Sequence, residues 1–417
     1  MSYLVLSALT IVLIIGPCWP ELIRYDNYNI YQVKPETSEQ LTLLEHLEST
    51  SDSLRFLTPI TTVGRSVNIL VAPHKQPEFL DILKDNGVAQ SLIEKDFQKT
   101  LDAEQESFKS RSGVYDWNSY HTLEENYEWL RTLVEQYPDK VELIVAGSTY
   151  EGREILGVKV SFKPDNKGVF LETGIHAREW IGPATVTYIL NQLLTSEDPA
   201  IRATAEKFDW YIIPHANPDG YAYTHTRDRL WRKTRSRSLF CYGADPNRNW
   251  DFYWNYVGAS SFGCSETYAG SSAFSEIETK SLSDYIKSLD GRIHTYIAFH
   301  SYSQILLFPY GHTKDHAPNH DDLQQIGDAA AAALAKRYGT KYKVGNIYEA
   351  IYPASGASVD WVYGTRDIKV AFTYELRPAS SSNGFVLPAN QIIPTGLETL
   401  DSLMALLGEA EKLNYYV

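Results

Sequence analysis

Cysteine is scarce in this chain, with only three residues among 417. This number excludes a small scaffold held together by several disulfides, because such scaffolds need a dense cysteine framework. Cys18 lies in the apolar N-terminal segment, which leaves Cys241 and Cys264 as an even pair. An even pair suits one disulfide if the chain reaches an oxidising compartment, and two free buried thiols are the alternative.

Positive charge is also in short supply. Lysine and arginine total 38 against 52 aspartate and glutamate residues, so the net charge is −14 and the isoelectric point is near 5.3. Nucleic acids and anionic membrane surfaces both reward clusters of basic residues. We therefore expect no nucleic-acid partner and no membrane partner. The mix of 43% hydrophobic and 22% charged residues is that of a globular protein.

Long hydrophobic runs are absent after the first residues. Residues 3–15 form an apolar core that is followed by Gly16, Pro17 and Pro20. This run is shorter than the roughly 20 residues that a membrane-spanning helix needs. It predicts a signal peptide over residues 1–20 and a secreted, extracellular protein. A retained membrane anchor is the alternative, since no charged segment precedes the run.

The chain divides into two parts of unequal size. The first part, residues 21–111, alternates short strands and helices and predicts a small α+β open sandwich. Its expected elements are 29–33, 38–47, 66–71, 77–86 and a helix over 96–111. The part ends in the basic run KSRSG. Such a junction after an acidic helix suits cleavage by a trypsin-like protease, and an ordinary interdomain linker is the alternative.

The second part, residues 112–417, predicts an α/β fold, with a mixed, mostly parallel twisted sheet and helices on both faces. Capping boxes predict two helix starts, one from Thr122 with Glu125 and one from Ser275 with Glu278. Sheets of this kind place functional sites in the loops beyond the carboxyl ends of their strands. The expected strands are 141–145, 155–161, 169–173, 210–214, 295–299 and 369–374.

Two residues just past one of these strand ends have the chemistry of metal ligands. His176 and Glu179 lie three positions apart, a spacing that puts both side chains on one side of a turn or helix start. An imidazole nitrogen and a carboxylate oxygen can share one zinc ion. Alone this pair is a weak signal, because chance produces it often and it fits neither the HExxH pattern nor its inversion. A third ligand has to come from elsewhere in the chain.

His300 and Glu375 are the candidates at two other strand ends. His300 closes an apolar run and is the best candidate for the third ligand, although a hydrogen-bonded core histidine is the simpler reading of it. Glu375 lies on the small-residue face of a buried strand, where a carboxylate is costly unless it is paired. It is either a partner of Arg377 or another arginine, or a general base for hydrolysis.

Three arginines recur close to these motifs, at Arg178, Arg232 and Arg248. Arginine forms two parallel hydrogen bonds to carboxylates and stabilises oxyanions. Each arginine taken alone is more often part of a surface salt bridge.

Seven short motifs share their order and spacing with one known family. They are GIHAREW, LWRKTR, DPNRNWD, HSYSQ, FPYG, IYPASGASVDW and FTYELR. Together they resemble the zinc metallocarboxypeptidases of the pancreatic A/B type, from about residue 114 to the C-terminus, and residues 28–111 resemble the activation propeptide of that family. The resemblance implies an activation propeptide over residues 21–111 and a carboxypeptidase catalytic domain over residues 112–417.

The resemblance implies one Zn²⁺ ion per chain. His176, Glu179 and His300 would be its ligands, with water in the open position. Asp245 would accept a hydrogen bond from His176 and so orient its ring. Glu375 would take the proton of the attacking water and pass it to the leaving amine.

Further residues would hold the substrate. Arg232, together with the zinc, would stabilise the oxyanion that forms during hydrolysis. Asn247 and Arg248 would bind the terminal carboxylate, helped by Tyr352, whose loop closes over the substrate. Arg178 would contribute as the substrate enters. Because only a chain end supplies such a carboxylate, this grip would explain exopeptidase action.

The family positions that line the specificity pocket carry no charge here. They are Leu307, Gly311, Ile347, Ala354, Ala357, Val359 and Thr373. Val359 stands where the basic-specific branch has an acid, so the resemblance implies the A-type preference for aliphatic or aromatic C-terminal residues. Ala357 stands where glycine is common, which would narrow the pocket. Cys241 and Cys264 match the family's single disulfide.

The sequence therefore predicts a secreted, monomeric zymogen of an A-type zinc carboxypeptidase that acts on peptide and protein C-termini. A trypsin-like activating protease and protein carboxypeptidase inhibitors are the expected partners. The alternatives are the same chemistry with basic or acidic specificity, a membrane-tethered receptor, and a catalytically inactive binding protein on the same fold. The presence of both Glu375 and Arg232 argues against the inactive protein.

Overall fold

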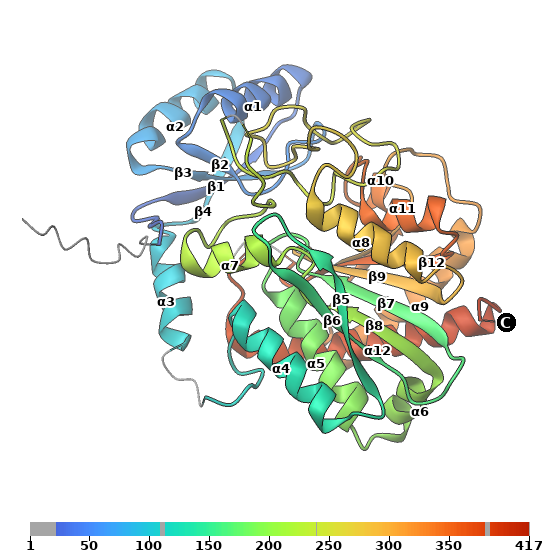
Figure 1. The fold of residues 1–417 in the computed structure, drawn as a ribbon. Helices are drawn as coiled ribbons and strands as arrows, with labels where there is room; N and C mark the ends of the chain where they lie inside the picture. Colours follow the sequence, from blue (N-terminus) through green and yellow to red (C-terminus); the bar gives the residue numbers. More distant parts are fainter. Residues whose placement is uncertain (1–21, 109–112, 239, 380–383, 417) are drawn as a thin grey trace, which may run out of the picture.

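The computed structural model describes residues 22–108, 113–238, 240–379 and 384–416 (Figure 1). The predicted signal peptide, residues 1–20, lies outside the described residues, and so do Lys109 to Arg111 of the basic junction. Within the described residues, no helix combines the length and the apolar character needed to cross a membrane.

The N-terminal part forms a four-stranded sheet with two helices on it and a core of its own. The strand order is β2-β3-β1-β4, and β1 pairs antiparallel with both β3 and β4. Its elements are β1 (Asn29–Lys34), α1 (Ser38–Thr50), β2 (Leu54–Phe56), β3 (Val67–Val71), a 3₁₀ turn (Pro73–Lys75), α2 (Gln76–Asp85) and β4 (Ala89–Glu94). Helix α3 (Gln98–Phe108) follows and runs along the side of the larger part (Figure 1). The open sandwich is confirmed, although the sequence analysis gave no bounds for the strands β2 and β4.

The larger part is built on an eight-stranded sheet of order β11-β10-β12-β9-β7-β8-β6-β5. Strands β8, β7, β9 and β12 are parallel neighbours at its centre, while β10, β6 and β5 introduce antiparallel pairs, so the predicted mixed sheet is confirmed. The strands are β5 (Val141–Ser148), β6 (Glu154–Val160), β7 (Lys167–Thr173), β8 (Phe208–Ile213), β9 (Ile293–Ser301), β10 (Ile305–Phe308), β11 (Lys343–Asn346) and β12 (Val370–Leu376).

Helices cover both faces of this sheet. Along β7, Thr173 faces the start of α5, where a Cβ on Gly182 would meet its Oγ1 at 2.2 Å. Phe170 points the other way, with its ring 6.4 Å from that of Tyr285 in α8. Helices α5, α9 and α12 pack on one another on the first face. The helices are α4 (Leu123–Gln136), α5 (Ile181–Thr195), α6 (Pro199–Lys207), α7 (Pro218–Thr226), α8 (Ile277–Ser288), α9 (His320–Tyr338), α10 (Ile347–Ala350), α11 (Ser358–Thr365), a 3₁₀ turn (Ala389–Gln391) and α12 (Ile392–Lys412).

One of the two predicted capping boxes is present. Thr122 Oγ1 accepts from Glu125 N, and the Glu125 carboxylate accepts from Thr122 N, at the start of α4. The second prediction was wrong, because α8 begins at Ile277 without a side-chain cap. The Glu278 carboxylate turns instead to the β5–β6 connection and accepts a hydrogen bond from Tyr150 N at 3.0 Å.

This buried carboxyl generates a prediction about stability and pH. Burial raises the pKa of Glu278 to about 7, and the nearby acids add to the effect. A carboxyl whose pKa is raised on folding contributes stability below its unfolded pKa, and loses it as pH rises toward the folded value. Glu278→Gln should therefore become more stable than the parent as pH rises from 5 to 8, by up to about 3 kcal/mol. Thermal unfolding across this range measures the difference.

Glu128→Gln, which removes a charge from an exposed position of α4, is the control and should follow the parent at every pH. A constant difference between Glu278→Gln and the parent from pH 5 to 8 would contradict the prediction.

Candidate active site

The loop after β7 brings His176 and Glu179 to the carboxyl edge of the sheet. Gly174 makes this turn with φ +68°, and a Cβ there would lie 2.8 Å from Pro214 O, so only glycine fits without strain. A backbone hydrogen bond from Glu179 N to His176 O, at 3.3 Å, closes the following turn. Both side chains consequently lie on the same side of the loop, as their spacing predicts.

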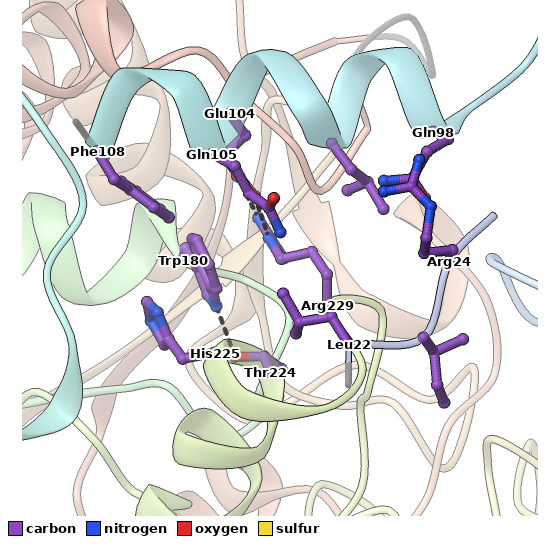
Figure 2. Close-up of a pocket in the computed structure, with 12 residues that line it drawn as sticks. Leu22, Arg24, Gln98, Glu104, Gln105, Phe108, Trp180, Thr224, His225 and Arg229 are labelled. Carbon is purple, nitrogen blue, oxygen red and sulfur yellow. Dashed lines mark hydrogen bonds and ion pairs between the residues drawn. The ribbon is translucent and has the colours of Figure 1, made fainter. Parts of the chain in front are cut away.

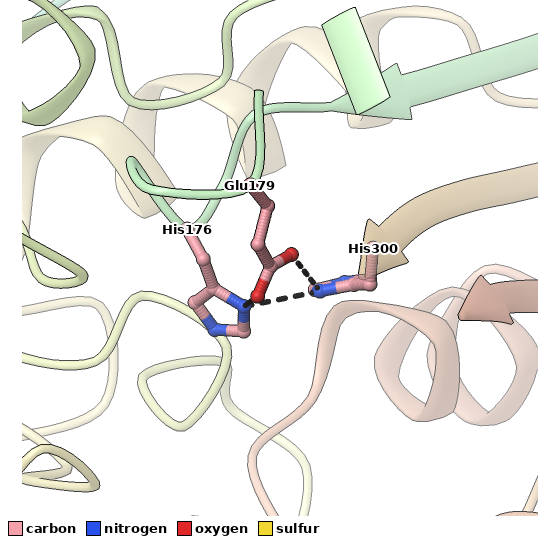
Figure 3. A group of neighbouring side chains, drawn as sticks. All are labelled: His176, Glu179 and His300. Atoms are coloured by element: carbon pink, nitrogen blue, oxygen red, sulfur yellow. Dashed lines mark hydrogen bonds and ion pairs between the residues drawn. The ribbon is translucent and has the colours of Figure 1, made fainter. Parts of the chain in front are cut away.

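His300 meets this pair from the neighbouring strand (Figure 3). Strand β9 runs parallel to β7, and Phe299 is level with Thr173. His300 Nδ1 lies 3.1 Å from His176 Nδ1 and 3.2 Å from Glu179 Oε2. His176 Nδ1 lies 2.8 Å from Glu179 Oε1. Three residues that are distant in the chain therefore direct three potential ligand atoms to one point.

The chemistry of these three side chains fits a zinc ion. His176 Nε2 lies 3.0 Å from Asp245 Oδ1, so in a neutral ring this nitrogen carries the proton and Nδ1 presents its lone pair. That lone pair faces a second ring nitrogen and a carboxylate, and all three side chains are buried. Electron-rich atoms held this close in a buried site need a cation between them. Two imidazoles and one carboxylate are a ligand set of catalytic zinc.

Asp245 links this cluster to Arg232. Its Oδ2 accepts from Arg232 Nη2 at 2.7 Å, and its Oδ1 accepts from Asn247 N at 2.9 Å in addition to the ring of His176. Burial alone would raise the pKa of this carboxyl, but the charge of Arg232 and the His176 ring hold it well below its usual range. Arg232 Nη1 also lies 3.8 Å from Glu179 Oε1, which places its guanidinium beside the cluster that could hold a metal ion.

Glu375 lies directly beside His300, because β12 pairs with β9 in a register that joins these two residues. Among the described residues it has neither a hydrogen bond nor an ion pair, and burial raises the pKa of its carboxyl to about 8. Arg377, which the sequence analysis offered as a salt-bridge partner of Glu375, pairs with Glu398 instead. The unpaired carboxyl of Glu375 therefore lies beside the cluster of His176, Glu179 and His300.

Asn247 and Arg248 follow Asp245 in one short loop. The Arg248 guanidinium is held from behind, since Nε donates to Gly258 O and Nη1 donates to Asn247 O, each at 2.8 Å. Its Nη2 has no hydrogen-bond partner within the described part of the chain. The ring of Tyr352 lies 5.8 Å from this guanidinium. Arg248 is thus held in place while its Nη2 remains available as a hydrogen-bond donor.

The disulfide is present, and the side chains at the expected pocket positions are buried. Cys241 and Cys264 are bonded and close the loop that carries Arg248 and Gly258. Val359, the second residue of α11, is 2% exposed. The side chains at the other expected pocket positions are buried as well, namely Leu307, Ile347, Ala354, Ala357 and Thr373.

The N-terminal part covers this site. A cavity of about 270 Å³ separates the two parts, and its walls come from both of them. Gln32, Thr58, Arg65, Ser66 and Asn68 line it from the N-terminal side, opposite His176, Glu179, Arg232, Tyr352 and Glu375. The N-terminal part also contacts Arg178, whose Nη2 donates a hydrogen bond to Leu57 O at 3.1 Å.

Helix α3 is clamped to the larger part by one buried ion pair (Figure 2). Arg229 donates from Nε and Nη2 to the two carboxylate oxygens of Glu104 at 2.7 and 2.9 Å, and each side chain is 7% exposed. The guanidinium of Arg229 lies 3.6 Å from the ring centroid of Trp180, one residue from Glu179. The clamp therefore reaches the loop that carries His176 and Glu179.

Two acids near the site were missed by sequence analysis. Glu266 binds Arg178 at 2.8 Å, and Asp228 binds Arg55 of β2 at 2.8 Å. Asp228 lies in the alternating run Arg227-Asp228-Arg229, which resembles any solvated charged turn. No sequence signal distinguishes these acids from ordinary surface residues, because their partners come from distant segments.

Family models match both parts of the chain. The model described as "Zinc carboxypeptidase" matches residues 126–402, and the model described as "Carboxypeptidase activation peptide" matches residues 31–104. The chain is 57% identical to Zinc carboxypeptidase A 1 of Anopheles gambiae over 400 residues, covering 95% of this chain and 92% of the relative. It is 43% identical to human Carboxypeptidase A1, covering 88% of this chain and 89% of the relative.

Solved structures agree with this assignment. The structure of thrombin activatable fibrinolysis inhibitor matches with a TM-score of 0.85 at 31% identity, over 93% of this chain and 99% of that one. Carboxypeptidase A from Helicoverpa armigera matches with a TM-score of 0.83 at 29% identity, over 93% and 98%. Bovine thrombin-activatable fibrinolysis inhibitor in complex with tick carboxypeptidase inhibitor matches with a TM-score of 0.66 at 37% identity, over 71% and 99%.

The fold and the His-Glu-His cluster define a zinc-dependent hydrolase. The chain belongs to the zinc carboxypeptidase family. It is an A-type metallocarboxypeptidase that uses Zn²⁺, and it carries an activation peptide in front of the catalytic part, which makes it a zymogen.

The clamp on α3 leads to a prediction about latency. In Glu104→Gln the amide keeps the shape of the side chain but loses its charge, and one charge-assisted hydrogen-bond pair weakens by about 2 kcal/mol. The cover should open more often, so the unprocessed chain should hydrolyse a small substrate up to roughly 30-fold faster. Initial rates of the unprocessed parent and variant measure this.

Glu78→Gln on the outer helix α2 is the matched control, because Glu78 is exposed and its ion-pair partner within the described part of the chain is the nearby Lys75. Equal initial rates for Glu104→Gln and the parent would show that this ion pair does not hold the cover closed.

Proposed function

We propose that His176, Glu179 and His300 hold the zinc ion of the catalytic part, and that Asp245 fixes the ring of His176. The hydrogen bond from His176 Nε2 to Asp245 supports this assignment, since it leaves Nδ1 to bind metal. Zinc in such a site polarises a carbonyl and lowers the pKa of water. We further propose boundaries at residues 20 and 111, with a signal peptide, an activation propeptide and the catalytic domain in that order.

Glu375 is the proposed general base. It takes the proton of the water that attacks the scissile carbonyl, and then delivers a proton to the leaving amine. Its free carboxylate beside His300 is the single observation that carries the proposal. Arg232 donates hydrogen bonds to the oxyanion of the tetrahedral intermediate, a role for which its fixed position on Asp245 suits it.

The terminal carboxylate of the substrate is bound by Asn247 and Arg248. Nη2 of Arg248 is the donor left over when its other nitrogens bind backbone carbonyls. Tyr352 closes over the substrate, and Arg178 contacts the incoming chain once Leu57 has left it. Internal peptide bonds offer no carboxylate to this grip, so cleavage is confined to the C-terminus.

The pocket for the C-terminal side chain is proposed to accept aliphatic and aromatic residues. Val359 and its neighbours provide an uncharged wall. The adjacent acid, Asp360, is turned to the backbone and accepts a hydrogen bond from Gly311 N at 2.9 Å. A basic side chain would therefore find no exposed acid there, and an acidic one would find no cation.

Activation is proposed to follow cleavage at the basic junction by a trypsin-like protease, which frees residues 21–111. We also propose that the protein is secreted, without a membrane-tethered form, and that it acts as a monomer. A relative has been solved with a tick carboxypeptidase inhibitor, and protein inhibitors of this kind are proposed to bind the open site of this chain.

The role of Glu375 is tested with Glu375→Gln. The variant loses the base but keeps the shape of the side chain, so kcat should fall at least about 10³-fold. Zinc content should remain about one ion per chain, because the three ligands are untouched. Steady-state kinetics and metal analysis of the activated protein measure both quantities.

Glu142→Gln on the exposed side of β5 serves as the control and should keep full activity. Substantial turnover by Glu375→Gln would exclude the residue as the base. No turnover by the parent after activation would favour the inactive binding protein.

The specificity is tested with peptides that differ only in the last residue. Leucine and phenylalanine should exceed lysine and glutamate by at least roughly tenfold in kcat/KM, since an unpaired charge in the buried pocket costs several kcal/mol. A preference for lysine or for glutamate would contradict the A-type assignment and support one of the two alternatives.

A further inference from the structure

The activation peptide inserts an arginine between two acids of the catalytic part. Arg55 Nη1 donates to both carboxylate oxygens of Asp228, at 3.1 and 2.8 Å, and its Nη2 donates to Leu230 O at 2.7 Å. Glu266 Oε1 lies 4.0 Å from Nη2. Tyr25 OH donates to Asp228 Oδ1 at 2.7 Å. The zymogen thus displays a site that binds a guanidinium through a carboxylate, a carbonyl and a second acid.

Removal of the activation peptide takes away both Arg55 and Tyr25. Of the partners that the Asp228 carboxylate has in this structure, only Leu230 N at 3.0 Å then remains. Asp228 is 5% exposed in the covered chain, where Tyr25 and Arg55 contribute to its burial, so removal of the peptide opens the carboxylate to solvent and to a new cation. The released catalytic domain therefore presents an acid that lacks its former cation.

The neighbouring cations have other partners in the catalytic part that hold them in place. Arg229 loses Glu104 with the activation peptide, but the carbonyl oxygens of Arg178 and Phe385 still accept from its Nη1 and Nη2, at 2.9 and 2.8 Å. Lys233 Nζ donates to Gly263 O at 2.8 Å. Arg178 itself forms an ion pair with Glu266. Glu266 therefore does not depend on Arg55 for its counter-charge, and its negative charge makes the electrostatic potential around the site more negative.

The segment that carries Arg55 approaches the catalytic centre in the same direction as a substrate. Two residues further on, Leu57 O accepts a hydrogen bond from Arg178. Thr58 and Pro59 then line the cavity that His176, Glu179 and Glu375 also line. A peptide substrate also runs with its C-terminal end toward the metal, so a side chain several residues upstream reaches the wall where Arg55 lies.

We propose that Asp228 and Glu266 form a subsite of the activated enzyme for an arginine side chain upstream of the scissile bond. This subsite rests on the proposed carboxypeptidase function and adds a substrate class to it, namely peptides with an apolar C-terminal residue and an upstream arginine. The planar fork of a guanidinium matches the carboxylate and the Leu230 carbonyl together, whereas a lysine ammonium offers a single point charge.

The test uses the full chain after trypsin treatment, with the trypsin then inactivated covalently. The substrates are peptides that end in leucine and carry one arginine two to five residues before the scissile bond, each paired with the same peptide containing neutral citrulline. At one position the arginine peptide should have a roughly tenfold higher kcat/KM, expressed mainly in KM, as expected for a charge-assisted hydrogen bond.

Asp228→Asn should reduce this arginine-to-citrulline ratio toward one. Asp290→Asn, at an exposed position that pairs with Arg366, is the matched control and should keep the ratio of the parent. Each ratio is internal to one enzyme preparation, so a lower yield of folded variant does not alter it.

A ratio of one at every position in the parent, or a ratio that Asp228→Asn leaves unchanged, would overturn the subsite. Hydrolysis of the citrulline peptides reports separately on the proposed function. If the activated parent cleaves neither member of any pair, the proposed function fails and the subsite fails with it.

Discussion

The bonds that Asp245 makes are the constraint on which the rest of the site depends. This fully buried carboxylate accepts from the His176 ring, from Asn247 N and from the Arg232 guanidinium. It thereby fixes through one side chain the positions of the proposed metal ligand His176, the proposed carboxylate-binding loop and the proposed oxyanion donor Arg232. A buried carboxylate is tolerable only when such donors surround it. Loss of any donor would leave the charge uncompensated, so the three functional groups are coupled in position.

The activation peptide occupies donors and acceptors of the catalytic part that a peptide substrate could also contact. Its Leu57 carbonyl takes a donor of Arg178, and its Arg55 occupies Asp228. A peptide chain can make these contacts both as an activation peptide and as a substrate. A cover formed by strand and loop segments therefore fits the mouth of the cavity. The ion pair of Glu104 with Arg229 then holds α3 beside the same entrance. The activation peptide is thus held by several separate contacts, and no single side chain of it binds the His-Glu-His cluster among the described residues.

Sequence patterns captured the elements that are long and strongly periodic, together with the residues at their carboxyl ends. His176, Glu179, His300 and Glu375 could be named because each follows an apolar strand, and parallel neighbours end at a common edge. Short elements such as β2, β10, α7 and α10 carry too few residues for a periodicity and were not predicted. The Ser275 capping box failed because Glu278 is drawn to Tyr150 N across the fold, a tertiary contact that local patterns do not contain. Asp228 and Glu266 escaped notice for the same reason.

The cavity between the two parts also indicates what removal of the activation peptide changes. Within the described residues, the activation peptide makes no hydrogen bond to His176, Glu179, His300 or Glu375, and the space in front of them stays open to small molecules of solvent size. The three side chains proposed as metal ligands already converge, and Glu375 is already free of Arg377, in the covered chain. If these residues have the proposed roles, cleavage has no catalytic geometry to create. Cleavage removes the activation peptide from one side of the cavity. The gain in activity on activation should therefore depend on substrate length more than on the chemistry of the bond that is cut.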